Sequence, residues 1–131
     1  MALMEILGAK RMGLEQIDPY QICIATTRKS PFVGNSESRD LLGRSIRTFR
    51  EDTRFPSEGL AAPSSWPGVG WSDHWSFWQE HYPAIMITDT AMFRNPYYHT
   101  RLDTADRIDF ARMARVVNGV RKVVKSLATE Q

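Results

Sequence analysis

Short apolar runs alternate with longer amphipathic segments along this chain of 131 residues. Four runs have the length and composition of strands: residues 3–7, 20–26, 59–62 and 84–88. The run 20–26 is nearly continuous in apolar residues, which is typical of a strand covered on both faces of a sheet. Residues 31–35 are expected to form a turn region rather than a strand. The pattern therefore predicts several short strands separated by connecting segments.

Helical spacing marks the connecting segments. Ser36 is expected to cap a helix, and the apolar residues that recur at helical spacing after it are Leu41, Leu42, Ile46 and Phe49. A second, short helix is expected to begin at Ser72 or Asp73 and to run to about His81. Asp109 is expected to cap a last helix, whose predicted apolar face consists of Phe110, Met113, Val117, Val120, Val124 and Leu127.

The order of these elements indicates an α/β fold. Strands followed by helices predict a three-layer α/β/α arrangement, with a mixed sheet between helices on its two faces. A chain of this length corresponds to one domain of ordinary size, so residues 1–131 are expected to form a single domain.

Composition and charge narrow the class of protein. Hydrophobic residues make up 42% of the chain and charged residues 24%, which favours a buried core over disorder. The net charge of +2 gives no concentrated basic face of the kind that binds nucleic acid. No apolar run approaches the roughly 18 residues of a membrane span, and the N-terminus lacks a signal-peptide pattern. We therefore expect neither a nucleic-acid nor a membrane partner, and a cytoplasmic location by default. The single Cys23 excludes an internal disulfide and is interpreted as a buried structural thiol.

Two residues stand out as candidate metal ligands. His99 follows the apolar run 84–88, at an expected exit from strand to loop, where sites form in open α/β sheets. Glu5 interrupts the apolar run 3–7, and a carboxylate there is costly to bury unless it has a partner or a metal. The alternative for Glu5 is an edge strand on which the carboxylate faces solvent.

The segment 66–81 supplies further candidates, each with a plain structural alternative. Asp73 could orient a catalytic group, or it could simply cap a helix. His74 could be a ligand, although its aromatic neighbours suggest that it packs among them, and His81 lies at a helix end, where a partly charged imidazole is favoured. The tryptophans could line an apolar substrate pocket or form a core patch: Trp66, Trp71, Trp75 and Trp78.

Several motifs occur in the order of a known family. They are WSDHWSFW at 71–78, YPAIMITDT at 82–90, FRNPYYHT at 93–100 and DTADRID at 103–109, preceded by LMEILG at 3–8. Residues 59–127 resemble the C-terminal part of the di-zinc aminopeptidase family. That family includes bacterial leucyl aminopeptidases, glutamate carboxypeptidases and, as zinc-dependent relatives, glutaminyl cyclases. The resemblance implies part of a phosphorylase/hydrolase-like zinc peptidase domain that acts on peptides.

The resemblance also implies roles for single residues. His99 matches the last zinc ligand, and Glu5 matches an acidic ligand of the other zinc. Tyr98 matches a position whose hydroxyl stabilises a tetrahedral oxyanion in some members, and Asp73 matches an acidic position beside the site. Such a family site would use zinc bound by imidazole and carboxylate groups to polarise the scissile carbonyl.

The chain departs from the family pattern in its metal and base motifs. It contains neither the His-x-Asp motif, whose aspartate bridges the metals, nor the Glu-Glu pair that provides a base and a ligand. Two ligands cannot hold a catalytic zinc, which usually has three protein ligands and a water. We therefore expect a portion that is inactive or incomplete alone. The alternatives are a non-catalytic interaction or assembly module, or a fragment of a glutaminyl-cyclase-like acyltransferase. Self-association through an exposed sheet edge is also expected.

Overall fold

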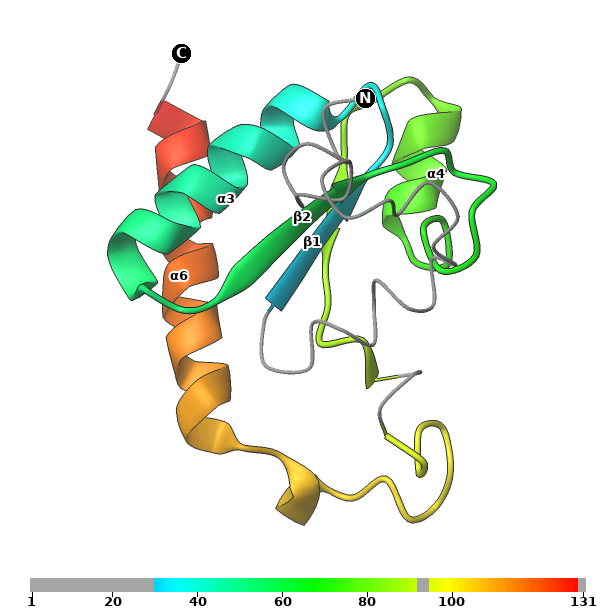
Figure 1. The fold of residues 1–131 in the computed structure, drawn as a ribbon, viewed down its shortest axis with the longest axis vertical. Helices are drawn as coiled ribbons and strands as arrows, with labels where there is room; N and C mark the ends of the chain where they lie inside the picture. Colours follow the sequence, from blue (N-terminus) through cyan, green and yellow to red (C-terminus); the bar gives the residue numbers. More distant parts are fainter. Residues whose placement is uncertain (1–29, 92–94, 130–131) are drawn as a thin grey trace, which may run out of the picture.

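The computed structural model describes residues 30–91 and 95–129. The predicted strands 3–7 and 20–26, with Glu5 and Cys23, lie outside these ranges. Figure 1 shows a small sheet with helices on its two sides. The elements, in chain order, are β1 (Ser30–Gly34), α3 (Arg39–Thr53), β2 (Ser57–Ala61), α4 (His74–Gln79), β3 (Ile85–Ile87), the 3₁₀ helix η2 (Ala105–Arg107) and α6 (Phe110–Thr129).

The described sheet is mixed, as expected for this fold class. Its strand order is β2-β1-β3, with β1 parallel to β2 and antiparallel to β3. The expected turn at 31–35 is wrong, because Ser30–Gly34 forms the central strand and all five residues are buried. Only two apolar side chains, Phe32 and Val33, mark this strand, which is too short to show an alternating pattern. Pro31 lacks an N–H, yet its carbonyl accepts a hydrogen bond from Thr88 N at 3.0 Å.

The two faces of the sheet pack against different helices. Phe32 of β1 is fully buried in a cluster with residues of α3 and α6, including Phe49 and Val123. Val33, the next residue, points to the opposite face and packs with Val69 and with Trp78 of α4. This alternation follows from the two-residue period of a strand. The three-layer α/β/α arrangement is therefore confirmed, with α3 and α6 on one side and α4 on the other (Figure 1).

Helix α3 begins later than the sequence suggested. Ser36 is not its cap, because the helix begins at Arg39 after Ser38. The side chain of Asn35 instead organises the turn: its Oδ1 accepts hydrogen bonds from Ser38 N at 2.9 Å and from Ser38 Oγ at 2.6 Å. Ser38 Oγ in turn accepts from Ala84 N at 3.0 Å, which ties the start of α3 to the segment before β3. A short polar network therefore replaces the simple cap.

Helix α6 starts as expected but buries a different face. Asp109 Oδ1 accepts a hydrogen bond from Arg112 N at 3.0 Å, so the predicted cap is confirmed. The buried residues are Gly119 and Val123, whereas Phe110, Met113, Val117 and Val124 are at least half exposed. Of the predicted apolar face, Val120 and Leu127 pack against the core, whereas these four residues are exposed. The apolar arc of α6 is wider than the surface that α3 and the sheet cover.

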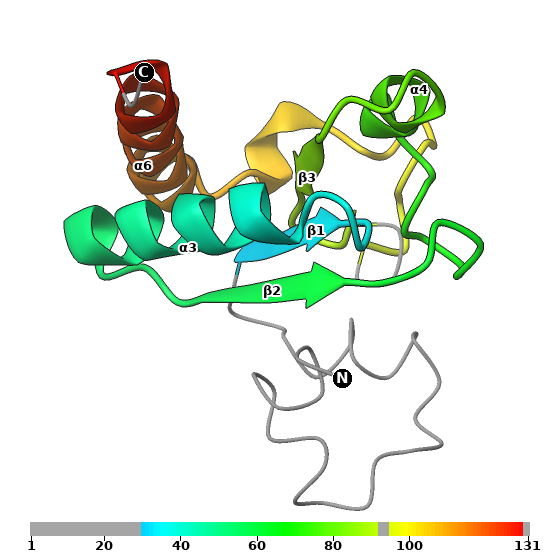
Figure 2. The ribbon, with the colours of Figure 1, turned by 90° about the horizontal axis from the view of Figure 1, so that it is seen from above.

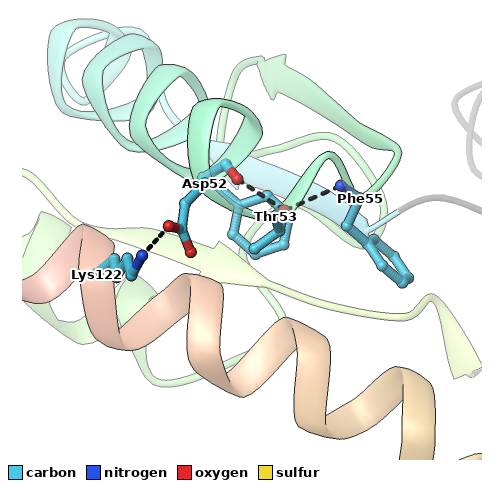
Figure 3. A network of polar contacts seen from close by, with 5 residues as sticks. Asp52, Thr53, Phe55 and Lys122 are labelled. Atoms are coloured by element: carbon cyan, nitrogen blue, oxygen red, sulfur yellow. Dashed lines mark hydrogen bonds and ion pairs between the residues drawn. The ribbon is translucent and has the colours of Figure 1, made fainter.

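The contact between α3 and α6 is close because Gly119 has no side chain. A Cβ at this position would lie 2.4 Å from Thr53 Cγ2 and 2.6 Å from a ring carbon of Phe49. Polar contacts flank this point (Figure 3): Lys122 forms an ion pair with Asp52, and Thr53 Oγ1 donates to Phe49 O at 2.7 Å.

No helix in the described ranges is long and apolar enough to cross a membrane.

Candidate functional site

The segment 95–107 follows β3 and carries Tyr98 and His99. Asn95 holds it from both ends, because its Oδ1 accepts from Tyr97 N at 3.0 Å and its Nδ2 donates to Asp103 Oδ1 at 2.8 Å. Thr100 N donates to Tyr97 O at 2.9 Å and closes the turn around His99. Each of these bonds joins two residues of the same segment, so the loop supports its own shape.

Arg107 closes the far end of this loop. Its guanidinium carbon lies 3.8 Å from the centroid of the Tyr97 ring, and its Nε donates to Leu102 O at 2.9 Å. A guanidinium stacked on an aromatic face is attracted by the ring quadrupole, and the planar group limits the orientations available to both partners. Arg107 thus fixes the residue two positions before His99.

Tyr98 and His99 form the exposed tip of the loop. Their rings stack with centroids 4.0 Å apart and an interplanar angle of 16°. His99 has a φ of 58°, in the left-handed region that few non-glycine residues adopt, although histidine is among the enriched types. Both side chains are exposed. The loop therefore presents an imidazole and a phenol side by side toward the outside.

The exit from β3 also has an unusual backbone. Thr90 is 3% exposed and has a φ of 60°, which is strained for a β-branched residue. Hydrogen bonds hold the turn, with Thr90 N donating to Thr88 Oγ1 at 3.0 Å and Ala91 N donating to Asp89 Oδ1 at 2.9 Å. Strain of this kind persists only where the surroundings enforce it, and it is enriched near functional sites. The sequence contained no signal for this strain.

Asp73 lies at the start of α4 but does not cap it. The helix begins without a side-chain capping hydrogen bond, and the Asp73 side chain is exposed. The alternative that Asp73 simply caps a helix is therefore wrong. Figure 1 shows α4 and the yellow loop that follows β3 toward different ends of the molecule, so the described structure does not bring Asp73 beside His99.

The other histidines have structural surroundings. His74 is 5% exposed, and its Nε2 lies 2.6 Å from Val69 O, which requires Nε2 to donate. Its ring also meets Trp78 edge-on, with centroids 4.5 Å apart. The expectation that His74 packs among aromatic residues is confirmed. Trp78 is buried, whereas the other tryptophans are exposed, so a core patch exists only at Trp78.

Comparison with protein families identifies the chain. The model of peptidase family M28 matches residues 24–124, which include both faces of the sheet and the loop with His99. The chain belongs to peptidase family M28. One relative, an uncharacterized protein named YfbL from Escherichia coli (strain K12), is 55% identical over 61 residues. This alignment spans 47% of the chain but only 19% of YfbL. None of the solved structures matches the chain.

Members of peptidase family M28 are generally zinc-dependent, so a metal site would need several ligand side chains close together. They contain no group of three or more histidine, cysteine, aspartate or glutamate side chains that could hold a metal ion. Glu5, the other expected ligand, lies outside the described residues. The residues in ranges 30–91 and 95–129 therefore do not fit a complete zinc site, although His99 could contribute one ligand.

Sequence reasoning selected the tip of the loop but missed what supports it. Asn95, Arg107 and Thr90 were not singled out as functional residues. For Asn95, the following proline was the available signal, because an Asn-Pro pair favours the start of a turn. For Arg107 and Thr90, no such signal existed, since their roles depend on a ring contact and on a backbone angle.

Proposed function

We propose that this chain is the C-terminal portion of an aminopeptidase-like, zinc-dependent peptidase and that His99 donates one ligand to its metal site. The observation that carries the proposal is the loop tip, where a self-supported turn presents His99 outward with Tyr98 stacked on it. Membership of peptidase family M28 supports the reaction class, which is hydrolysis of a peptide bond.

Tyr98 is proposed as the oxyanion donor of this site. Its ring stacks on the His99 imidazole with centroids 4.0 Å apart, so both side chains are presented by the same exposed turn. A hydroxyl held beside the reacting carbonyl could donate a hydrogen bond to the developing negative charge. We do not include Asp73 in this site, because it begins α4, and α4 and the loop after β3 lie toward different ends of the molecule (Figure 1).

We also propose that this chain alone does not contain a complete active site. The His-x-Asp and Glu-Glu motifs are absent from the chain, so a base and several ligands would have to come from other polypeptide. We therefore expect no hydrolysis of a leucine anilide by this chain in zinc-containing buffer, measured by release of the coloured aniline. Hydrolysis abolished by H99A would show that the site is complete. Cyclisation of a glutaminyl peptide would instead indicate an acyltransferase.

Zinc titration by calorimetry tests the role of His99. The expected result is weak binding of one zinc ion, reduced at least about tenfold by H99A, which corresponds to a loss of about 1.4 kcal/mol of binding free energy. The matched control is H81A, which removes an exposed histidine that also has a positive φ. Equal binding by both variants, or no binding by the wild-type chain, would favour a non-catalytic module on this scaffold. The exposed apolar face of α6 is the observation that favours this second candidate.

A further inference from the structure

The turn at which the chain leaves β3 is tied to the sheet. Strand β3 runs antiparallel to β1, and just beyond their last paired residues Thr88 N donates to Pro31 O at 3.0 Å. Thr90 N then donates to Thr88 Oγ1 at 3.0 Å, and the Thr90 side chain is buried. Figure 2 shows β3 beside β1, with α6 on one side of it and α4 on the other. The start of the turn is therefore fixed to the body of the protein.

Asp89 extends this fixed point to Ala91. Its side chain is exposed, and its Oδ1 accepts a hydrogen bond from Ala91 N at 2.9 Å. A carboxylate that bonds the N–H two residues later forms an Asx turn, which restricts the backbone of the residue between them. That residue, Thr90, has a φ of 60°, which a β-branched residue adopts only where its surroundings hold it. The bond from Ala91 N to Asp89 is one of the contacts that hold this conformation.

Ala91 links the turn to the loop 95–107. Its N–H is held by Asp89, and its carbonyl accepts a hydrogen bond from Asn95 N at 2.7 Å. Asn95 is the residue that holds the loop from both ends. Hydrogen bonds therefore lead from β1 through residues 88–91 to the loop. The bonds within the loop set its shape, whereas the bonds of the turn set the direction in which it leaves the sheet.

We propose that Asp89 is a positioning residue, whose carboxylate oxygen sets the direction in which the loop with His99 leaves the sheet. Its consequence for zinc rests on the proposed function, whereas the direction of the loop does not depend on a metal. The competing role for Asp89 is that of a charge, either as a metal ligand or as the partner of a cation. The bond to Ala91 N favours positioning, because it requires an acceptor and not a negative charge.

Asparagine and alanine at position 89 separate the two roles, because D89N keeps the acceptor and removes the charge, whereas D89A removes both. Residual dipolar couplings of the backbone amides, measured by NMR on the full chain without metal, report the orientation of the loop relative to β1 and α3. In D89A we expect the couplings of Asn95, Tyr97 and Thr100 to change, whereas D89N should give wild-type values. Exchange of the Asn95 amide hydrogen should accelerate roughly fivefold or more in D89A, since the hydrogen bond that holds Ala91 is lost.

Two controls separate positioning from a general effect on the fold. Urea denaturation of D89A should give a midpoint close to that of the wild type, because Asp89 is exposed. E51A removes an exposed carboxylate from α3 and should leave the couplings of the loop unchanged. Unchanged loop couplings in D89A would overturn the proposal. Equal changes in D89A and D89N would overturn it in favour of a role for the charge.

The response of the His99 ring nitrogens to zinc connects this positioning to the proposed function. Their zinc-induced shift should be reduced in D89A and restored in D89N. Wild-type nitrogens that do not respond to zinc would contradict the proposed function, whereas the metal-free couplings would still decide the role of Asp89. An equal response in the wild type and in D89A would show that the loop is placed without Asp89 and would overturn the proposal.

Discussion

The packed body of α3, α6 and the sheet differs from the loop 95–107 in what stabilises it. The body buries Phe32 and Phe49 completely and joins segments far apart in the sequence. The loop buries little and depends on hydrogen bonds and one stacked guanidinium between residues close in sequence. The free energy of unfolding should therefore depend on the body, whereas the geometry of Tyr98 and His99 should depend on the loop.

The largest effect is expected from F49A in the core. The Phe49 ring is fully buried and meets Phe32 and Phe55 edge-on, at centroid distances of 5.1 and 6.4 Å. Its removal should lower the free energy of unfolding by about 3–5 kcal/mol, because contacts are lost and a cavity remains. Urea denaturation measures this change. F77A is the control, because Phe77 is 55% exposed. Equal destabilisation by both variants would contradict the dependence of stability on the buried core.

Two glycines should respond to alanine with opposite signs. G119A places a Cβ against Thr53 and Phe49, and we expect a destabilisation of about 1–2 kcal/mol after allowing for better helix propensity. G43A adds a Cβ in open space on α3 and should stabilise the protein by up to about 1 kcal/mol. Thermal unfolding of both variants measures the difference. A stabilising G119A would show that α3 and α6 are not in close contact.

The support of the loop should be separable from global stability. N95A removes the acceptor for Tyr97 N and the donor to Asp103, so exchange of the Tyr97 amide hydrogen should accelerate. The free energy of unfolding should change by less than about 1 kcal/mol, because the bond to Asp103 is exposed and the bond from Tyr97 N is only partly buried. Hydrogen exchange measured by NMR tests this, with N118A as an exposed asparagine control. Unchanged exchange at Tyr97 would contradict a self-supported loop.

The smallest expected effect is on the pKa of Asp106 and, through it, on stability at low pH. A hydrogen bond from the Thr104 side chain lowers the pKa of Asp106, and hydrogen bonding to the Asp106 backbone and the nearby Arg107 charge act in the same direction. The folded-state pKa of Asp106 lies below its unfolded value. The contribution of this carboxylate to the free energy of unfolding is therefore present above the unfolded pKa and is lost as the pH falls through the folded pKa. T104V should raise the pKa toward its ordinary value, as measured by NMR titration of the carboxyl carbon. An unchanged titration would remove Thr104 as the cause.

The sequence predicted the parts of the fold that have strong local signals. The cap at Asp109, the short strand before residue 88 and the burial of His74 among aromatic rings were all readable from neighbouring residues. Strand β1 was not, because two apolar residues between proline and glycine carry no period. The sequence also did not reveal which part of the apolar face of α6 is buried, since five valines spread this face and only tertiary contacts decide which of them are covered.

The candidate site was predictable at its tip and not at its base. His99 was identified from its place after an apolar run and Tyr98 from a family resemblance, and the structure places both on one exposed turn. The roles of Asn95 and Arg107 depend on side-chain contacts within the loop, which spacing alone does not reveal. Asp73 shows the converse, because its position suggested a cap and the structure shows none.

The most direct test of a zinc ligand at the loop tip is the NMR spectrum of the histidine ring nitrogens. Uniformly ¹⁵N-labelled chain would be recorded before and after addition of one equivalent of zinc. We expect one ring nitrogen of His99 to shift as it binds the metal, whereas the rings of His74 and His81 stay unchanged. Unchanged His99 nitrogens, or equal shifts at the exposed His81, would contradict the assignment of this loop as the metal-binding part of the chain.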